Sequence, residues 1–141
     1  MKIGTLKETF EDEQRVALTP ESALQLKKLG HECIIEKGAG LASGFNDAEY
    51  KTAGVAIAPS AAAVTKASDI ITKVRPPTAT EIKRLTTSKT LISFFYPSSN
   101  DELMELARAR SASIIAMDMV PRISRAQKMD ALSSMANIAG Y

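Results

Sequence analysis

Residues 113–130 read SIIAMDMVPRISRAQKMD, an apolar run followed by a polar connection. The run from Ser113 to Met117 has the composition of a buried strand, whereas the residues after Pro121 show no strand alternation. A helical period starts only near Leu132. The pattern therefore predicts a strand whose carboxyl end leads into a polar loop, and in open α/β sheets that edge is where ligands bind.

The rest of the chain alternates strand-like and helix-like segments. Further strands are expected at 2–6, 32–36, 55–58, 69–74 and 90–95. Helices are expected at 20–29, 47–53, 60–67, 78–85 and 101–110. This alternation predicts an α/β fold with an open, mostly parallel sheet and helices on both faces, of the Rossmann-like or flavodoxin-like type.

Two of the expected helices have recognisable start signals. Thr19 precedes Pro20, which is favoured at the first helical position, and Glu21 adds an acid near the positive end of the helix dipole. Asn100 is expected to cap a second helix, because acids occupy the first turn after it and arginines occupy the last turn, around Arg108.

The glycines that follow the strand at 32–36 permit two interpretations. Gly38-Ala39-Gly40 could begin a phosphate-binding loop, but a G-x-G-x-x-G fingerprint needs glycine at position 43, where this chain has Ser43. Gly44 is one position late, and no helix with a clear period opens there. We therefore expect a plain turn rather than a dinucleotide fingerprint.

Length and composition bound the class of protein. A chain of 141 residues fits one domain with a sizeable core. Its 18 basic and 16 acidic residues are interspersed and give a net charge of +2, which argues against a nucleic-acid partner.

Cys33 lies in an apolar run and is expected to be a core residue in a reducing compartment. His31, the lone histidine, has no companions for a metal site, so none is expected.

The two ends of the chain suggest where it belongs in a larger protein. The amino terminus lacks the features of a signal peptide, and no run approaches the roughly 20 apolar residues of a membrane span, so we expect no membrane insertion by this chain. Leu132, Met135, Ala136 and Ala139 form an apolar helix stripe that is still running at Tyr141. We therefore expect residues 1–141 to be the amino-terminal segment of a larger two-domain protein, with a nucleotide-binding domain downstream.

Polar residues gather where the expected strands end. They are Lys7, Glu8, Arg15, Lys73, Arg75, Tyr96, Asp118, Arg122, Arg125, Gln127 and Asp130. Because the carboxyl ends of parallel strands share one rim, these side chains should lie near one another. A rim rich in cations suits an anionic or carboxamide-bearing ligand, and an amide such as Gln127 can donate and accept at once. The alternative is a set of solvated charges that pair with each other.

Several motifs resemble one known family along essentially the whole chain. They are Met1-Lys2-Ile3-Gly4, Arg15-Val16-Ala17-Leu18-Thr19-Pro20, Leu29-Gly30-His31, Glu36-Lys37-Gly38-Ala39-Gly40 and residues 69–73. Together they resemble the amino-terminal domain shared by alanine dehydrogenases and the alpha subunit of proton-translocating NAD(P) transhydrogenases. Residues 121–130 with Leu132-Ser133-Ser134 are similar to the transhydrogenase loop named for its Arg, Gln and Asp.

The resemblance implies a function and a set of site residues. It implies part of the NAD(H)-binding component of a transhydrogenase, which transfers hydride between NADH and NADP⁺ coupled to proton translocation. The residues implied in catalysis are Arg122, Gln127 and Asp130, and those implied in cofactor binding are Arg122, Ile123, Ser124, Arg125, Gln127, Asp130 and Ser133. In this reading Arg122 and Asp130 position the nicotinamide carboxamide, and Gln127 reaches the nicotinamide ribose of NADP(H).

The resemblance also implies partners and a location. NADP(H) would be held by a partner component, membrane-spanning components would complete the assembly, and the alpha subunit would be a homodimer. The domain would lie, as a peripheral soluble unit, on the cytoplasmic face of a bacterial inner membrane.

Two alternatives remain open. Alanine dehydrogenases resemble the chain at Arg15 and Lys73 but have a histidine where this chain has Tyr96, and a phenol with a pKa near 10 cannot replace an imidazole. An alanine dehydrogenase-like enzyme is therefore the weaker reading. The other alternative is a non-catalytic interaction or dimerisation domain.

Overall fold

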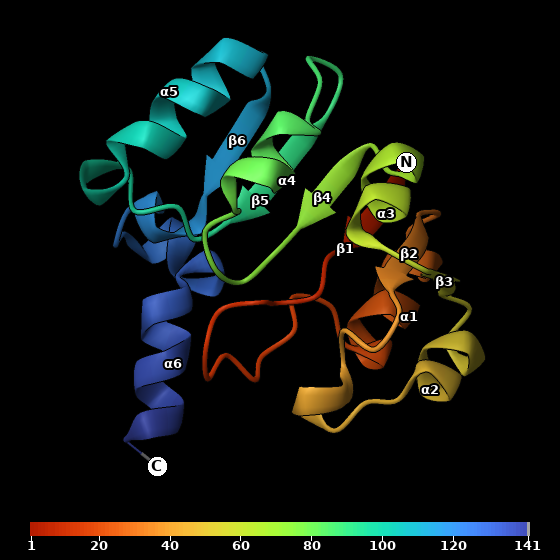
Figure 1. The fold of residues 1–141 in the computed structure, drawn as a ribbon. Helices are drawn as coiled ribbons and strands as arrows, with labels where there is room; N and C mark the ends of the chain where they lie inside the picture. Colours follow the sequence, from red (N-terminus) through yellow and green to blue (C-terminus); the bar gives the residue numbers. More distant parts are fainter. Residues whose placement is uncertain (141) are drawn as a thin grey trace.

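The computed structural model describes residues 1–140, which form six strands and six α-helices (Figure 1). The strands are β1 (Lys2–Thr5), β2 (Glu32–Glu36), β3 (Ala56–Ala58), β4 (Ile70–Thr72), β5 (Thr90–Ser93) and β6 (Ser113–Ala116). The helices are α1 (Pro20–Lys28), α2 (Asp47–Thr52), α3 (Ala61–Ala67), α4 (Ala79–Lys83), α5 (Asp101–Arg110) and α6 (Ala131–Ala139). Short 3₁₀ helices are η1 (Leu41–Ser43), η2 (Pro97–Ser99), η3 (Met117–Met119) and η4 (Ser124–Met129). Tyr141, the last residue of the expected domain, lies outside the described residues.

The strands form one sheet in the order β3-β2-β1-β4-β5-β6, and every pairing is parallel. This confirms the expected open parallel α/β fold. The strand order reverses between β1 and β4, because the chain crosses from β3 at one edge back to the centre through α3. The carboxyl ends of all these strands face one rim, and the reversal marks where ligands bind in folds of this kind.

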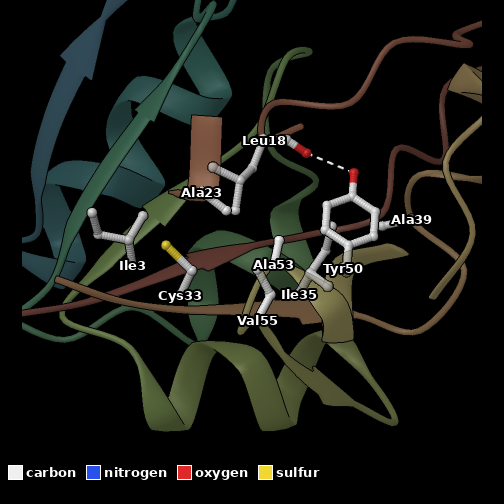
Figure 2. Packing of buried hydrophobic residues seen from close by; sticks show 9 residues of the cluster. All are labelled: Ile3, Leu18, Ala23, Cys33, Ile35, Ala39, Tyr50, Ala53 and Val55. Carbon is white, nitrogen blue, oxygen red and sulfur yellow. Dashed lines mark hydrogen bonds between the residues drawn. The ribbon is translucent and has the colours of Figure 1, made fainter. Parts of the chain in front are cut away.

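One face of the sheet is covered by α1 and α2, over its β1–β3 half. Ile3, Cys33 and Ile35 point to this face and pack with Ala23 of α1 and with Tyr50 of α2 (Figure 2). Cys33 is buried there as a core residue, as the sequence predicts. The fully buried Tyr50 donates a 2.7 Å hydrogen bond from its hydroxyl to the Leu18 carbonyl, as the dashed line in Figure 2 shows. This bond ties the loop that leads into α1 to the core.

The opposite face is covered by α3, α4 and α5. Ile34, Ile71 and Leu91 alternate with the residues just described, as side chains on a pleated strand must, and they pack with Val64 of α3. The approach of α3 is close: a Cβ built on Gly4 would lie 2.6 Å from Cγ1 of Val64. Glycine at this position therefore lets the central strand and the crossover helix touch.

Coverage is uneven between the two halves of the sheet. On the α1 side of the β4–β6 half, Ile115 remains 49% exposed, while Ile92 and Phe94 line cavities. In Figure 1, α6 follows the short helical turns after β6 and extends away from the sheet. The predicted apolar stripe of α6 does form a helix, but Leu132 is 42% exposed and no residue of that helix is buried. The open half-face therefore adjoins the carboxyl rim.

The helix-start predictions had different outcomes. Thr19 caps α1 as expected, because its hydroxyl accepts a 3.1 Å hydrogen bond from the Ser22 N–H. Asn100 occupies the N-cap position of α5 as predicted, but its side chain makes no capping hydrogen bond. The Asn100 side-chain amide instead donates to the carbonyls of Phe95 and Tyr96, at 2.9 and 3.2 Å. These two carbonyls lie in a tight turn after β5 and need a donor, which the amide nitrogen supplies.

The glycines after β2 form a plain turn, as the sequence predicts. The Gly38 N–H donates to the Asp47 carboxylate at 2.9 Å, so a carboxylate of this chain already occupies that backbone donor. A Cβ on Gly40 would lie 2.6 Å from Cε2 of Tyr50. Glycine is therefore needed at position 40 for core packing.

Candidate functional site

A small polar cavity of about 240 Å³ lies at the carboxyl rim, after β6. It is lined by Arg122, Ile123, Ser124, Gln127, Asp130 and Ser133. These are six of the seven residues named as cofactor-binding from the sequence; the seventh, Arg125, does not line it. The loop coils into η4, which is anchored by the buried Ala126, and this brings the polar side chains of one short segment around a common space.

The polar side chains of this cavity differ in their exposure to solvent and in their hydrogen bonds to the rest of the chain. Arg122 and Gln127 are exposed. Within residues 1–140 their side chains form no ion pair or hydrogen bond, so their donors and acceptors are available to a ligand. Asp130 is different, because only 6% of it is exposed.

Asp130 serves the fold as well as the cavity. Its carboxylate caps α6, accepting hydrogen bonds from the Leu132 N–H at 3.0 Å and the Ser133 N–H at 3.3 Å. It also accepts a 2.6 Å hydrogen bond from the Ser133 hydroxyl. The hydrogen bond from Ser133 and, to a smaller extent, the nearby Arg122 charge hold the pKa of Asp130 below its usual range. The carboxylate is therefore ionised at neutral pH.

Asp118, another rim residue, is used by the backbone. Its two carboxylate oxygens accept the Phe95 N–H at 2.6 Å and the Tyr96 N–H at 3.0 Å. Asp118 therefore joins the end of β5 to the segment after β6.

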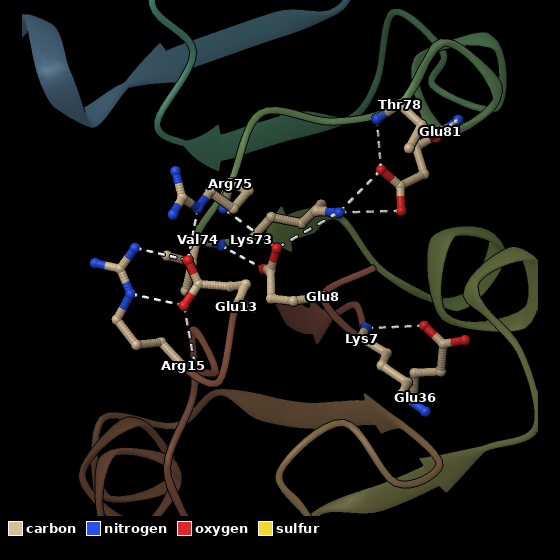
Figure 3. A network of polar contacts seen from close by, with 10 residues as sticks. All are labelled: Lys7, Glu8, Glu13, Arg15, Glu36, Lys73, Val74, Arg75, Thr78 and Glu81. Atoms are coloured by element: carbon tan, nitrogen blue, oxygen red, sulfur yellow. Dashed lines mark hydrogen bonds and ion pairs between the residues drawn. The ribbon is translucent and has the colours of Figure 1, made fainter. Parts of the chain in front are cut away.

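A second group of rim residues pairs within itself (Figure 3). The ammonium of the buried Lys73 donates to both oxygens of Glu81 at 3.2 and 3.1 Å and lies 3.7 Å from a Glu8 oxygen. Glu8 in turn accepts the backbone N–H groups of Val74 and Arg75, at 2.6 and 3.2 Å. These contacts hold the loop after β1 against the end of β4.

Glu13, whose side chain is 3% exposed, completes this network. It accepts two side-chain hydrogen bonds from Arg15, at 2.8 and 2.7 Å, and one from Arg75 at 2.6 Å. Arg15, followed by Arg75, lowers the pKa of Glu13 to about 2 in spite of the opposing effect of burial. Glu13, and smaller contributions from Tyr96 and Glu8, raise the pKa of Arg15.

The two interpretations of the rim therefore each hold for one part of it. Lys73, Arg75 and Arg15 are paired with carboxylates, as the alternative supposes, although the Lys73–Glu81 pair is buried and not solvated. Arg122 and Gln127 are left for a ligand. Sequence reasoning missed Glu13 and Glu81 as partners. Glu13 had a signal, since it lies two positions before Arg15, whereas Glu81 meets Lys73 only through the packing of α4.

A larger, mostly apolar cavity of about 600 Å³ adjoins the start of α6. It is lined by Arg15, Val16, Val74, Phe94, Met117, Lys128, Met129, Ala131, Ser134 and Met135. Ala131 and Ser134 directly follow the polar-cavity residues Asp130 and Ser133. The first turn of α6 therefore separates a polar cavity from an apolar one that carries two cations.

Other features of the described chain do not add to this site. No cluster of three or more potential metal ligands occurs among residues 1–140. None of the helices in that range combines the length and apolarity needed to cross a bilayer. A separate cavity of about 260 Å³ is lined by residues at the opposite end of the sheet, among them Lys2, His31 and Cys33.

The fold is an open, parallel α/β domain, and the cavity at its carboxyl rim after β6 is the candidate ligand site. The chain belongs to the family described as alanine dehydrogenase/PNT, N-terminal domain, whose model matches residues 4–139.

Known proteins of two kinds are similar to the chain. It is 63% identical over 141 residues to the NAD(P) transhydrogenase subunit alpha of Cereibacter sphaeroides, covering all of this chain and 27% of that protein. The crystal structure of a transhydrogenase from Sinorhizobium meliloti matches with a TM-score of 0.93 and 40% identity, covering all of this chain and 42% of that one. An L-alanine dehydrogenase structure matches with a TM-score of 0.83 and 30% identity, over 89% of this chain and 34% of that one. The chain thus spans less than half the length of each.

Proposed function

We propose that the chain is part of the NAD(H)-binding component of a proton-translocating NAD(P) transhydrogenase. Two observations favour this branch of the family over the alanine dehydrogenases. Sequence identity is 63% to a transhydrogenase subunit and 30% to the alanine dehydrogenase structure. The family resemblance of the sequence favours the same branch, because it implies a histidine in alanine dehydrogenases where this chain has Tyr96.

The observation that carries the proposal is the donor set of the polar cavity. A nicotinamide carboxamide has one carbonyl acceptor and an NH₂ donor. Arg122 supplies guanidinium donors, and Asp130 supplies an ionised acceptor beside the Ser133 hydroxyl, so the residues fit a carboxamide.

The size of the cavity defines what this chain can hold by itself. At about 240 Å³ it lies below the roughly 300–1,000 Å³ of a pocket that encloses a whole drug-sized ligand. It suits the nicotinamide end of NADH, and the adenosine and pyrophosphate would be bound by residues beyond this chain.

The roles of the individual side chains follow from their exposure. Arg122 and Asp130 orient the carboxamide and so fix the plane of the nicotinamide ring. Gln127, whose amide is exposed and unpaired within the described residues, reaches the nicotinamide ribose of NADP(H) on the partner component. Ile123, Ser124 and Arg125 contribute through the loop backbone, since Arg125 does not line the cavity.

The chemistry is supplied by the nucleotides: NADH and NADP⁺ become NAD⁺ and NADPH by transfer of one hydride between the two rings. Because this transfer neither consumes nor releases a proton, the proposal assigns no acid or base to this chain. The chain orients one ring and excludes water around it. The partners proposed are the NADP-binding component, membrane-spanning components that couple the reaction to proton movement, and a second alpha subunit. We place the domain at the cytoplasmic face of a bacterial inner membrane.

A graft provides the test. In a chimaeric subunit this chain replaces the matching 141 residues of the Cereibacter sphaeroides subunit, which it resembles at 63% identity. The chimaera is expressed in that organism in place of its own subunit, and hydride transfer from NADH to an NADP⁺ analogue is followed in single turnovers. Transfer should occur, and Arg122→Ala should slow it roughly 100-fold, because a misplacement of about 1 Å can cost that much in rate.

A matched control distinguishes loss of the Arg122 contact from the general effect of removing a positive charge. Arg84 is also exposed but lies at the end of α4, far along the chain from the cavity residues. Arg84→Ala should leave transfer unchanged. If the wild-type chimaera folds and transfers no hydride, or if Arg122→Ala transfers at the wild-type rate, the proposal fails.

A further inference from the structure

Helix α6 is weakly attached to the domain, although it carries part of the polar cavity. Asp130 caps this helix and Ser133 lies in its first turn, and both residues line the cavity. Within α6, Ala131 and Met135 are half-buried and the other residues are exposed. The elements that α6 contacts most are η3 and η4, which precede it directly in the chain. A contact with a distant segment therefore has a large influence on where α6 lies.

Arg15 makes such a contact. It belongs to the loop between β1 and α1, which lies beside α6 (Figure 1). Its Nη1 donates a 3.0 Å hydrogen bond to Sδ of Met135, 120 positions further along the chain. Both residues line the apolar cavity, so packing beneath this part of α6 is incomplete. The hydrogen bond joins α6 to the loop at the point where side-chain packing does not.

The guanidinium of Arg15 is held in a fixed orientation. Its Nε and Nη2 donate to the two oxygens of Glu13, at 2.8 and 2.7 Å (Figure 3). The Arg15 backbone N–H donates to the same carboxylate at 2.9 Å. Glu13 is fixed in turn by a 2.6 Å hydrogen bond from Arg75, which follows β4. Because the planar fork is bound at Nε and Nη2, Nη1 can point in only one direction, which is towards Met135.

We propose that Arg15 is a positioning residue for the polar cavity. Held by Glu13, it fixes α6 through Met135. In this way it keeps Ser133 and Asp130 at the positions where they would bind a nicotinamide carboxamide. This inference rests on the proposed function and extends it to a residue outside the cavity. Arg15 acts through α6 and needs no contact with the nucleotide.

Hydrogen exchange of the 141-residue chain tests the contact without reference to the reaction. A helix of nine residues is marginal in water by itself, so a loosened α6 should open more often. Arg15→Lys keeps the charge, but a single ammonium cannot replace the fork that binds Glu13 and Met135 together. Met135→Leu keeps the size and removes the acceptor. In each variant the amides of residues 135–139 should exchange about fivefold faster, the effect of one hydrogen bond.

A double variant and a control make this test specific. Arg15→Lys combined with Met135→Leu should open α6 no more than either change alone, because both remove the same bond. Arg75→Lys is the matched control, since Arg75 also pairs with Glu13 but forms no hydrogen bond to α6 within residues 1–140. It should leave exchange in α6 unchanged. Unchanged exchange in both single variants, or additive effects in the double variant, would overturn the link.

The chimaera tests the consequence for the cavity. Arg15→Lys and Met135→Leu should each weaken NADH binding about fivefold and slow hydride transfer, because Ser133 and Asp130 lose their fixed positions. Ile3→Val, a core change with a similar cost in stability, should bind NADH as the wild type does. A loosened α6 with unchanged NADH affinity would contradict the positioning role. If the wild-type chimaera transfers no hydride, the proposed function fails, and hydrogen exchange still decides whether Arg15 fixes α6.

Discussion

The hydroxyl of Ser133 donates a 2.6 Å hydrogen bond to the carboxylate of Asp130, which at the same time caps α6 through two backbone N–H groups. One carboxylate thus both starts a helix and lines the polar cavity. Because the cavity and the helix share this group, a substitution at Asp130 can affect folding, ligand binding or both. The variants Asp130→Asn and Asp130→Ala separate the effect on folding from the effect on ligand binding.

Asp130→Asn retains a side-chain oxygen that can cap α6 but loses the charge that we assign to the carboxamide. In the chimaera it should weaken NADH binding while the melting temperature of the isolated chain stays nearly constant. Asp130→Ala loses the cap as well, and should also lower the melting temperature by a few degrees. Calorimetry measures both quantities. Equal melting temperatures for the two variants would show that the cap contributes nothing.

Gln127→Ala should slow hydride transfer in the chimaera without changing its affinity for NADH. The reason is that Gln127 is proposed to act on the nucleotide of the partner component. Since the side chain is exposed, the free energy of unfolding should change by no more than about 0.5 kcal/mol. Single-turnover kinetics measure the rate of hydride transfer, and NADH titration measures the affinity. A loss of NADH affinity would assign the amide to this component's own nucleotide instead.

The isolated 141-residue chain should bind NADH with a dissociation constant well above 1 μM, which corresponds to about 8 kcal/mol. The polar cavity accommodates only one end of the molecule, and the glycine turn after β2 is occupied by Asp47 and Tyr50. Isothermal titration is the measurement. Binding near 1 μM would reveal a dinucleotide site elsewhere in the chain.

The purified chimaera should not form NADH from alanine at a useful rate. Tyr96 cannot act as an imidazole does near neutral pH, and Arg15 and Lys73 are already paired with Glu13 and Glu81. A spectrophotometric assay with alanine and NAD⁺ tests this. Substantial NADH formation would move the chain to the alanine dehydrogenase branch.

The stability of the chain should fall in acid partly through Glu13. Its pKa is lowered from 4.5 to about 2, so the folded state favours the ionised form. This contribution is complete above pH 4.5 and is lost as the pH falls towards 2. Glu13→Gln should therefore be less stable than the wild type at pH 7, with the difference shrinking in this window. Urea titrations across the range would show it; a constant difference would exclude the ion pairs as its source.

Sequence reasoning predicted most of the fold because the signals for it are local. The sequence predicts the second strand at 32–36, and it is Glu32–Glu36 in the structure, because the continuous apolar run Cys33-Ile34-Ile35 is a local signal. The fourth strand was expected at 69–74 but ends at Thr72. The next residue, Lys73, forms ion pairs with Glu81 and Glu8. These contacts could not be predicted, because they depend on how separate segments of the chain pack.

The same distinction explains the outcome for the candidate site. The polar cavity could be anticipated because its residues lie within one short segment, from Arg122 to Ser133. The pairing of Glu8 with the Val74 and Arg75 backbone could not, because 66 or more positions separate these residues. The position of Asn100 at the start of α5 could be predicted, but the partners of its side chain, the carbonyls of Phe95 and Tyr96, could not, because the turn that presents them has no sequence signal.

The position of β1 in the middle of the sheet has a consequence for the order of folding. On one side β1 pairs with β2, Lys2 facing Glu32; on the other it pairs with β4, Ile3 facing Ile70. During synthesis, the half built from β1, β2 and β3 is complete once Ala58 has left the ribosome. At a synthesis rate of about 5–20 residues per second, Ile70 of β4 follows about a second later. We expect this half to form first and to expose the free edge of β1 until β4 adds to it, because the longer loop closes later. In pulsed hydrogen exchange, amides of β2 should gain protection before those of β4.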